Sequence, residues 1–371
     1  MKVLAGLLAA AGLAWPAAAT ATDDFRPFAA IEVSPAVHVL STPPDFYGPA
    51  IGNIVVIEQS DGMVVVDSGT SIGHGRAIVR YIRSLTSNPV KAVVITHWHN
   101  DHPQGVAALQ EAWPGIRVIA TPATKAGMLG PESESIALKP DASMDKQMFD
   151  RVEGSKVEYR KILEAPDTPE DRRERIRKAL VQFDDFYNDF RGSYLVPPTE
   201  MFDKRLVIPD RKAPVEVLYL GRANTAGDAI VWLPSQRIVA SGDVVVSPVP
   251  FGFNSYPADW IKTLARIKEL GFTILIPGHG EPMHDARYVD HLIASITNIR
   301  NQVGAAVKAG LNFKQVKERV ELSGEAGRFT DVARFKAAIP ENWTEPMVVN
   351  AYKEAKGIPI RQTGNPEPDP K

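Results

Sequence analysis

The 371-residue sequence contains no cysteine. This absence excludes disulfide bonds, thiolate metal ligands and cysteine nucleophiles. Any metal-dependent chemistry must therefore use imidazole, carboxylate and neutral oxygen ligands. The stability of the fold must come from its hydrophobic core, together with any metal that it binds.

The sequence also lacks a strong net charge, because 42 lysine and arginine residues nearly balance 44 aspartate and glutamate residues. A formal net charge of -2 provides no basic field that would attract nucleic acid. We therefore expect a small-molecule substrate, neutral or weakly charged, and no nucleic-acid partner. The contents of 44% hydrophobic and 23% charged residues are those of a globular protein.

Long apolar runs are missing except at the N-terminus, where Lys2 precedes a stretch rich in alanine and leucine from Val3 to Trp15. The run is too short for a membrane span, and the small residues at 17–21 provide cleavage sites. This layout predicts a signal peptide over residues 1–21, a periplasmic or secreted location, and no stable membrane anchor after cleavage. An uncleaved N-terminal anchor is the alternative.

Short buried strands alternate with amphipathic helices along most of the chain, which is typical of a layered α/β fold. Helices are predicted around residues 77–82 and 105–112, and a long helix around 288–307 that ends at Gly310. In open α/β sheets ligands bind at strand ends, and three candidate ligand clusters directly follow apolar strands. The predicted strands cover residues 37–40, 54–58, 63–66, 92–96, 117–120, 205–208, 215–220, 229–233, 237–240 and 273–276.

Residues 124–198 interrupt this rhythm, since they are charged and poor in strand signals. Thr168 is predicted to cap a helix that has Pro169 in its first position. We interpret the segment as a helical insertion and hypothesise that it acts as a lid over a site. Its apolar face, at helical spacing, consists of Ile176, Leu180, Phe183, Tyr187 and Phe190.

The densest chemical signal is the segment Thr96-His97-Trp98-His99-Asn100-Asp101-His102, which follows a buried strand. The chain has only eight histidines, so packing does not explain three in one short segment. In extended backbone, side chains two residues apart point to the same side, so His97 and His99 can bind one ion. Asp101 and His102 lie beyond the turn and can face a second position. Imidazole and carboxylate ligands suit Zn²⁺ and neighbouring divalent metals.

The pattern His97-x-His99-x-Asp101-His102 resembles the HxHxDH motif of the metallo-β-lactamase superfamily. Further pieces stand in the family's order, namely Asp67-Ser68-Gly69 upstream, and Ser241-Gly242-Asp243 and Pro277-Gly278-His279-Gly280 downstream. The resemblance covers residues 32–285 and implies an αββα sandwich with metals at one edge. We accordingly divide the chain into a signal peptide (1–21), a metallo-β-lactamase-like domain (22–287) that contains the helical insertion, and a C-terminal helical extension (288–371).

Carried over by position, the resemblance implies a first metal site at His97 and His99. It implies a second site at Asp101, His102 and His279, with Asp243 bridging the two. The family's remaining histidine lies in a segment resembling Gly-x-x-His-Thr-x-Gly, where this chain places Asn224 at the histidine position.

Asn224 changes the expected metal content, because an amide oxygen binds Zn²⁺ more weakly than imidazole does. We therefore predict unequal affinities, with the second site filled preferentially. Asn224 either coordinates through its carbonyl, which favours a harder ion such as Mn²⁺, or only hydrogen-bonds near the site.

The implied chemistry is hydrolysis that uses metal-bound hydroxide. Zn²⁺ (one or two ions, with Mn²⁺ or Fe²⁺ as alternatives) lowers the pKa of bound water, and Asp101 orients the nucleophile or passes its proton. In the family the residue at Asp67 orients a metal-bound histidine. Elsewhere in the sequence, His74 and His284 are interpreted as surface or turn residues, and His38 and His291 as structural.

The sequence favours a hydrolase acting on an amide, lactam, lactone or other ester, with phosphotriester, sulfate-ester and thioester cleavage left open. The aromatic loop 247–256, Tyr47 and Trp98 either wall a substrate pocket or only pack. Asn224 suggests an alternative, a catalytically impaired binding protein on the same scaffold, although the other six candidate ligands are retained. Redox chemistry at a di-iron site ranks last.

Overall fold

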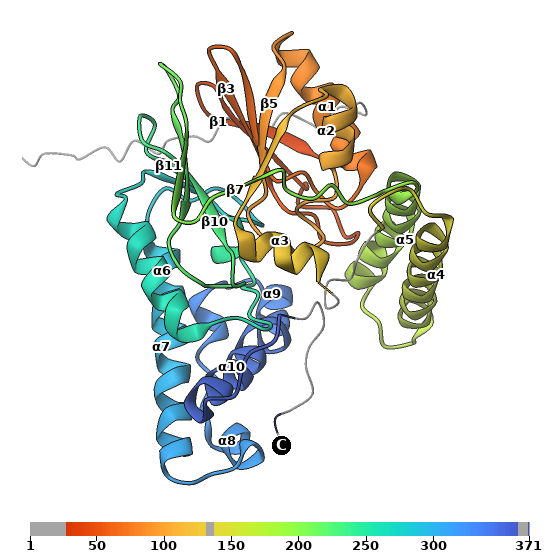
Figure 1. The fold of residues 1–371 in the computed structure, drawn as a ribbon. Coiled ribbons are helices and arrows are strands. Elements are labelled where there is room, and N and C mark those ends of the chain that lie inside the picture. The colour runs from red at the N-terminus through yellow and green to blue at the C-terminus, as the bar shows by residue number, and fades with distance from the viewer. Residues whose placement is uncertain (1–26, 131–136, 363–369, 371) are drawn as a thin grey trace, which may run out of the picture.

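The computed structural model describes residues 27–130, 137–362 and 370. Two β-sheets pack face to face, and helices cover the outer face of each (Figure 1). This arrangement confirms the predicted αββα sandwich. The predicted signal peptide, residues 1–21, lies outside the described residues. Within the described part, no helix has the length and hydropathy needed to cross a bilayer.

The first sheet changes from antiparallel to parallel pairing at β4. Its strands are β1 (Ala29–Ser34), β2 (Val37–Ser41), β3 (Ile54–Gln59), β4 (Gly62–Val66), β5 (Val90–Val94), β6 (Arg117–Ala120) and β7 (Glu200–Met201), in this order. Strands β1 to β4 are antiparallel, and β4 to β7 are parallel. The parallel strands place their carboxyl ends at the same edge of the sheet.

The second sheet is antiparallel except for the pair β11 and β12. Its strands are β8 (Arg205–Ile208), β9 (Val215–Tyr219), β10 (Ala229–Leu233), β11 (Ile238–Ala240) and β12 (Ile274–Ile276), in the spatial order β12-β11-β10-β9-β8. Each predicted strand has a counterpart, with ends that differ by at most two residues. The sequence missed β1, which lies at an edge and is partly exposed, and β7, whose two residues carry no periodicity.

Alternate residues of the strands build the core between the sheets. Val39 and Val66 of the first sheet and Val217 and Val231 of the second belong to one buried cluster. Since side chains alternate between the faces of a strand, the next residue along points to the outer helices. This alternation explains why the predicted strands are apolar throughout instead of half polar.

Separate helices cover the two outer faces. On the first sheet lie α1 (Ile72–Leu85) and α2 (Val106–Ala112), and on the second lie α6 (Pro257–Glu269), α7 (Arg287–Lys308) and α10 (Glu345–Lys356). The long helix α7 agrees with its prediction, and Gly310 follows its end with φ +82°. The other helices of the C-terminal region are α8 (Phe313–Arg319), η3 (Ala326–Arg328), α9 (Ala333–Ile339) and η4 (Pro340–Thr344).

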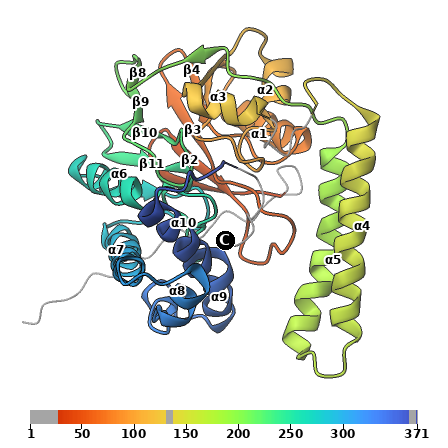
Figure 2. The ribbon, with the colours of Figure 1, turned by 60° about the horizontal axis from the view of Figure 1, so that its bottom comes forward.

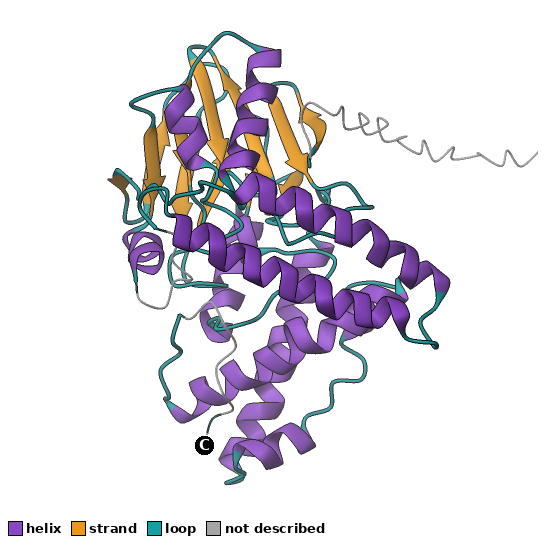
Figure 3. Cartoon of the chain, turned by 90° about the vertical axis from the view of Figure 1, so that its right-hand side faces the viewer, coloured by secondary structure: helices purple, strands orange, loops and turns teal. Residues whose placement is uncertain are grey.

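The insertion is a helical hairpin beside the sandwich (Figures 2 and 3). It follows α3 (Pro122–Leu129) and consists of α4 (Ala142–Glu164) and α5 (Glu170–Phe190). The helix α5 begins one residue later than predicted, with Pro169 in the cap position, while the Thr168 hydroxyl donates to the Ile162 carbonyl at 2.6 Å. Its buried face also differs in part, because Ala179 and Phe186 are buried where Leu180 and Tyr187 are half-buried.

Candidate metal centre

The candidate ligands lie on loops at the carboxyl ends of two parallel strand pairs. Residues 96–102 follow β5, and Asp67 follows its parallel neighbour β4. Asp243, in the short turn η2 (Gly242–Val244), follows β11, and His279 follows its parallel neighbour β12. Hydrogen bonds between these loops, such as that from Gly278 N to Gly242 O at 2.9 Å, hold them together. Strand ends therefore bring distant residues to one place.

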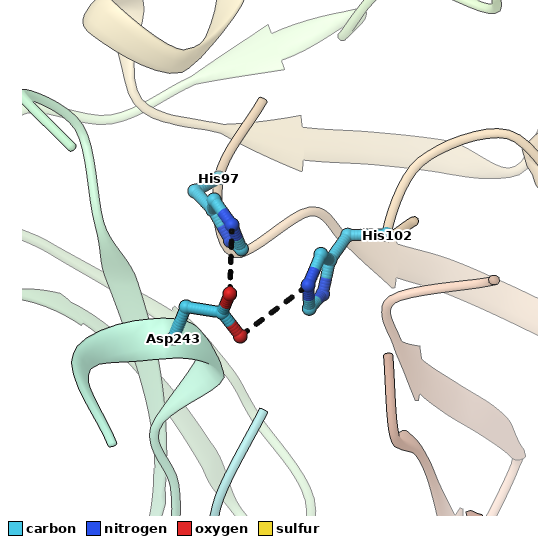
Figure 4. Close-up of side chains that lie close together, drawn as sticks. All are labelled: His97, His102 and Asp243. Carbon is cyan, nitrogen blue, oxygen red and sulfur yellow. Dashed lines mark ion pairs between the residues drawn. The ribbon is translucent and has the colours of Figure 1, made fainter. Parts of the chain in front are cut away.

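Asp243 lies at the centre of the cluster, as Figure 4 shows for two of its neighbours. Its Oδ2 is 3.6 Å from Nε2 of His97, and its Oδ1 is 3.4 Å from Nε2 of His102 and 3.6 Å from Nε2 of His279. Asp101 also belongs to the cluster, with Oδ2 2.9 Å from Nε2 of His279. The position of Asp243 between these histidines is the one that a bridging ligand requires.

His99 extends the cluster beyond His97. Its Nδ1 lies 3.0 Å from Nε2 of His97, and its ring packs against those of Trp98 and Phe251, with centroids 4.7 and 5.8 Å away. The two imidazoles therefore lie side by side, whereas the two groups of clustered ligand atoms do not include His99, so the binding of one ion by His97 and His99 stays a prediction.

The donor set fits a divalent cation. Two triads, His97 with His102 and Asp243, and Asp101 with His102 and His279, each have ligand atoms within 4.8 Å of one another. Nε2 of His102 and Oδ1 of Asp243 are buried without a hydrogen-bond partner. An unpaired buried polar atom costs roughly 1–3 kcal/mol, a penalty that coordination removes. Nitrogen and carboxylate donors without thiolate suit Zn²⁺ and neighbouring transition metals.

The charges of the cluster are strongly coupled. Burial, followed by the neighbouring imidazole of His102, holds the pKa of His97 well below its ordinary value. Burial opposes protonation of His102 too, but the carboxylates of Asp101 and Asp243 outweigh it and raise the His102 pKa. Burial likewise disfavours the Asp101 carboxylate, yet the His102 charge lowers the Asp101 pKa overall. Two carboxylates therefore stay ionised here, ready to balance a cation.

Asp67 orients the cluster without joining it. Its Oδ1 accepts from the backbone N–H of Thr96 at 2.9 Å, and its Oδ2 accepts from the Thr96 hydroxyl at 2.8 Å. Its Oδ2 also lies 2.8 Å from Nδ1 of His102, so Nε2 of that ring faces the site. This is the positioning role that the resemblance implies.

Asn224 is buried close to the aromatic loop. Its amide nitrogen donates to the Phe251 carbonyl at 2.9 Å, and its Oδ1 is buried without a hydrogen-bond partner. This oxygen has no hydrogen-bond partner among the described residues, and coordination of a metal through it stays a prediction. Asn224 therefore connects its own segment, where the family has a histidine, to the loop of Phe251. The Phe251 ring in turn contacts His99.

Two supporting side chains escaped the sequence analysis. The amide of Asn53 donates to the carbonyls of Pro277 and Gly280 at 2.9 and 2.7 Å and so shapes the turn of His279. Asp228 accepts from the backbone N–H groups of Ala223 and Thr225 and so shapes the turn of Asn224. No sequence pattern pointed to Asn53. Asp228 ends the segment that contains Asn224, and this position is the signal that could have identified it.

The interpretation of His74 as a surface or turn residue is wrong. It lies in the first turn of α1 with 1% of its surface exposed, and its Nδ1 accepts from the Thr70 backbone N–H at 3.1 Å. The rings of Phe28 and Phe186 enclose it, and burial lowers its pKa to about 3. Helical periodicity places it on the buried face of α1, which is the signal that would have found it. His38 pairs with the Tyr81 hydroxyl, and His284 and His291 are exposed.

A cavity of about 1030 Å³ opens onto the cluster at His99, Asp101, Asp243 and His279. The loop 246–253 and Trp98 form part of its wall, while Tyr47 does not line it and packs against the first core cluster. Residues of the α4 and α5 hairpin, of α9 and of η4 also line the cavity. The insertion thus borders the site, as the lid hypothesis requires.

A family model described as the metallo-beta-lactamase superfamily matches residues 47–279. The chain belongs to this superfamily. Its fold and the order of its ligand-bearing loops are therefore those expected of a metal-dependent hydrolase scaffold.

Two kinds of relative stand out. A curated linear primary-alkylsulfatase from Pseudomonas sp. is 23% identical over 301 residues, which are 75% of this chain and 52% of the relative. The chain thus spans about half the length of the curated relative that it matches. Among solved structures, a stereoselective inverting sec-alkylsulfatase from Pseudomonas sp. has TM-score 0.55 at 14% identity, covering 88% of this chain and 50% of that one.

A metallo-beta-lactamase from Pontibacter korlensis has TM-score 0.50 at 16% identity, covering 73% of this chain and 99% of that one. At these identities the solved structures establish the fold alone.

Proposed function

We propose that this chain is a metal-dependent hydrolase of an ester that carries an apolar chain or ring. The observation that carries the proposal is the cavity of about 1030 Å³, which joins the candidate ligands to a wall of aromatic and aliphatic side chains. Ligand sites of this kind combine a large apolar surface with a few convergent polar groups. Asp101 is the residue that we assign a catalytic role.

The chemistry at the polar end follows from the ligands. A divalent cation held by His97, His99, His102, Asp101, Asp243 and His279 would supply Lewis acidity and lower the pKa of a bound water. Asp67 keeps Nε2 of His102 turned toward the site. Asp101, 20% exposed and hydrogen-bonded to His279, reaches both the cluster and the cavity, so it can orient a water or carry its proton.

The apolar end is supplied by the hairpin. Met144, Met148 and Val152 of α4 line the cavity together with Phe183 and Phe186 of α5. Removing apolar substrate surface from water against this wall contributes about 25 cal/mol per Å². We therefore expect catalytic efficiency to rise with the length of the apolar group.

A sulfate ester is the second candidate. The curated alkylsulfatase and the sec-alkylsulfatase structure both support it, and the second of these aligns with 88% of the chain, more than the lactamase relative does. An alkyl sulfate would place its chain against the hairpin and its sulfate at the ligand cluster. Binding without turnover, through an incomplete first metal site at Asn224, is the remaining alternative.

The experiment compares p-nitrophenyl acetate, butyrate and octanoate, a lactone, a β-lactam and decyl sulfate, each with added Zn²⁺ or Mn²⁺ and with a chelator. We expect metal-dependent release of p-nitrophenol that is fastest for the octanoate. Sulfate release from decyl sulfate with inactive carboxylic esters would select the second candidate. Tight binding of octanoate ester without turnover under any metal would contradict the hydrolase.

We also propose a periplasmic or secreted location, supported by the basic start, apolar run and small residues of the first 21 positions. N-terminal sequencing of protein recovered from the periplasm should begin near residue 20. A mature chain that retains Lys2 would contradict this proposal.

A further inference from the structure

Gln362, beyond the end of α10, contacts three separate loops of the candidate site. Its Oε1 accepts from Nε1 of Trp98 at 3.4 Å and from the backbone N–H of Ala226 at 3.0 Å. Its Nε2 donates to the Asn254 carbonyl at 2.5 Å. One amide side chain therefore uses both its acceptor and its donor to join three loops of the candidate site.

Each contacted loop carries a part of the site. Trp98 stands between His97 and His99, and its ring packs on His99. Ala226 lies two residues after Asn224, in the turn that Asp228 shapes. Asn254 belongs to the loop whose Phe251 contacts His99 and accepts from the Asn224 amide.

The loop at Asn254 needs an external restraint. Asn254 is a buried non-glycine residue with φ +50°, in the left-handed region that side chains disfavour. The C-terminal helices provide two more restraints, because Gly252 N donates to Asn342 O at 2.8 Å and the Asn350 amide donates to Gly252 O at 2.7 Å. Gln362 restrains the same loop through Asn254 and also contacts Trp98, in the loop that carries His97 and His99.

We propose that Gln362 is a positioning residue that fixes the wall of the substrate cavity relative to the ligand cluster. The hydrogen bonds of Gln362 to Trp98, Ala226 and Asn254 do not involve a candidate metal ligand, so its loss should affect the cavity wall more than metal binding. It fixes Trp98 and the loop of Phe251, which line the cavity, so its loss weakens substrate binding. The kinetic part of this inference rests on the proposed function, whereas the structural part does not.

The structural test is amide hydrogen exchange followed by mass spectrometry. In Gln362→Ala we expect faster exchange in peptides that cover residues 223–228 and 251–256. In Gln362→Glu the carboxylate still accepts from Trp98 and Ala226 but cannot donate to Asn254. Residues 223–228 should therefore remain protected in this variant while residues 251–256 exchange faster. Arg361→Ala, an exposed neighbour in the same segment, is the matched control and should exchange like the unmodified chain.

The kinetic test uses the ester that the substrate comparison identifies. Because a hydrogen bond that holds the cavity wall is lost, Gln362→Ala should raise KM about fivefold, with kcat within about twofold. Unchanged exchange in Gln362→Ala, or an equal increase in Arg361→Ala, would overturn the proposal. If no ester is turned over, the exchange pattern still decides the role of Gln362, which separates its failure from that of the proposed function.

Discussion

Gly278 lies directly against the carboxylate of Asp243. A Cβ atom at position 278 would stand 2.0 Å from Oδ1 of Asp243, far inside van der Waals contact. The variant Gly278→Ala must therefore push Asp243 away from His97 and His102. We expect metal affinity to fall about 10- to 100-fold, as it does when the support of a ligand is lost, measured by chelator competition.

The matched control for this substitution is Gly304→Ala on α7, where a Cβ meets no atom within 4 Å. It should keep full metal affinity and gain about 1 kcal/mol of helix stability. Equal metal affinity in Gly278→Ala and Gly304→Ala would show that Asp243 is not a ligand.

Asn224 is expected to limit the occupancy of the first site. After mild dialysis the chain should retain about one ion, because an amide oxygen replaces the imidazole found in resembling segments. The variant Asn224→His should retain two ions and turn over substrate faster, as measured by elemental analysis and by ester hydrolysis. Two tightly held ions in the unmodified chain would contradict the unequal affinities.

The strands and the part of the ligand cluster at residues 97–102 could be predicted because both are local patterns. Apolar runs such as Ala92–Ile95 need no partner to be recognised, and the three histidines near 100 follow one of them directly. Asp243 and His279 were predicted only because their short motifs resemble those of the metallo-β-lactamase family, and the structure brings Asp243 within 4 Å of His102 and His279 within 4 Å of Asp101.

The rest depends on contacts between distant parts of the chain. Gln362 lies 264 residues from Trp98, and Asn53 lies 224 residues from Pro277, so neither has a local signature. The position of Phe186 against His74 follows from how the hairpin docks, which periodicity along α5 cannot specify. Tyr47 was a candidate for the cavity wall on aromatic character alone, and the fold turns it elsewhere.

His74 gives the protein an acid-sensitive contribution to stability. Its pKa is about 3 in the folded chain because of burial, against about 6.5 when unfolded. The unfolded chain therefore binds more protons between these pH values. The contribution of His74 to the free energy of unfolding is complete above pH 6.5 and declines as the pH falls toward 3. The loss amounts to at most about 5 kcal/mol, at 1.36 kcal/mol per pKa unit.

The variant His74→Gln should be less stable at pH 7 by about 1 kcal/mol but should show a flatter dependence on pH. Asp189, 3.9 Å away, is the facing acid, and burial raises its pKa to about 6. Chemical denaturation of both proteins in the Asp189→Asn background therefore isolates His74. Parallel stability curves from pH 3 to 7 would contradict a buried neutral imidazole.

The hairpin should set the preference for the apolar group. Met148→Ala removes about 40 Å² of apolar wall, worth about 1 kcal/mol, so kcat/KM for the octanoate should fall about fivefold. The acetate, which cannot reach this wall, should be unaffected. Val157→Ala on the exposed face of the same helix is the control. A loss shared equally by acetate and octanoate would mean that the hairpin acts on the metal centre instead.

Elemental analysis of the purified chain, beside His102→Ala and His291→Ala, is the most direct measurement. His102 belongs to both ligand triads, whereas His291 is exposed on α7. We predict at least one divalent ion per chain in the unmodified protein and in His291→Ala, and none in His102→Ala. A chain without bound metal after growth in zinc, or full metal content in His102→Ala, would contradict the assignment of this cluster as a metal centre.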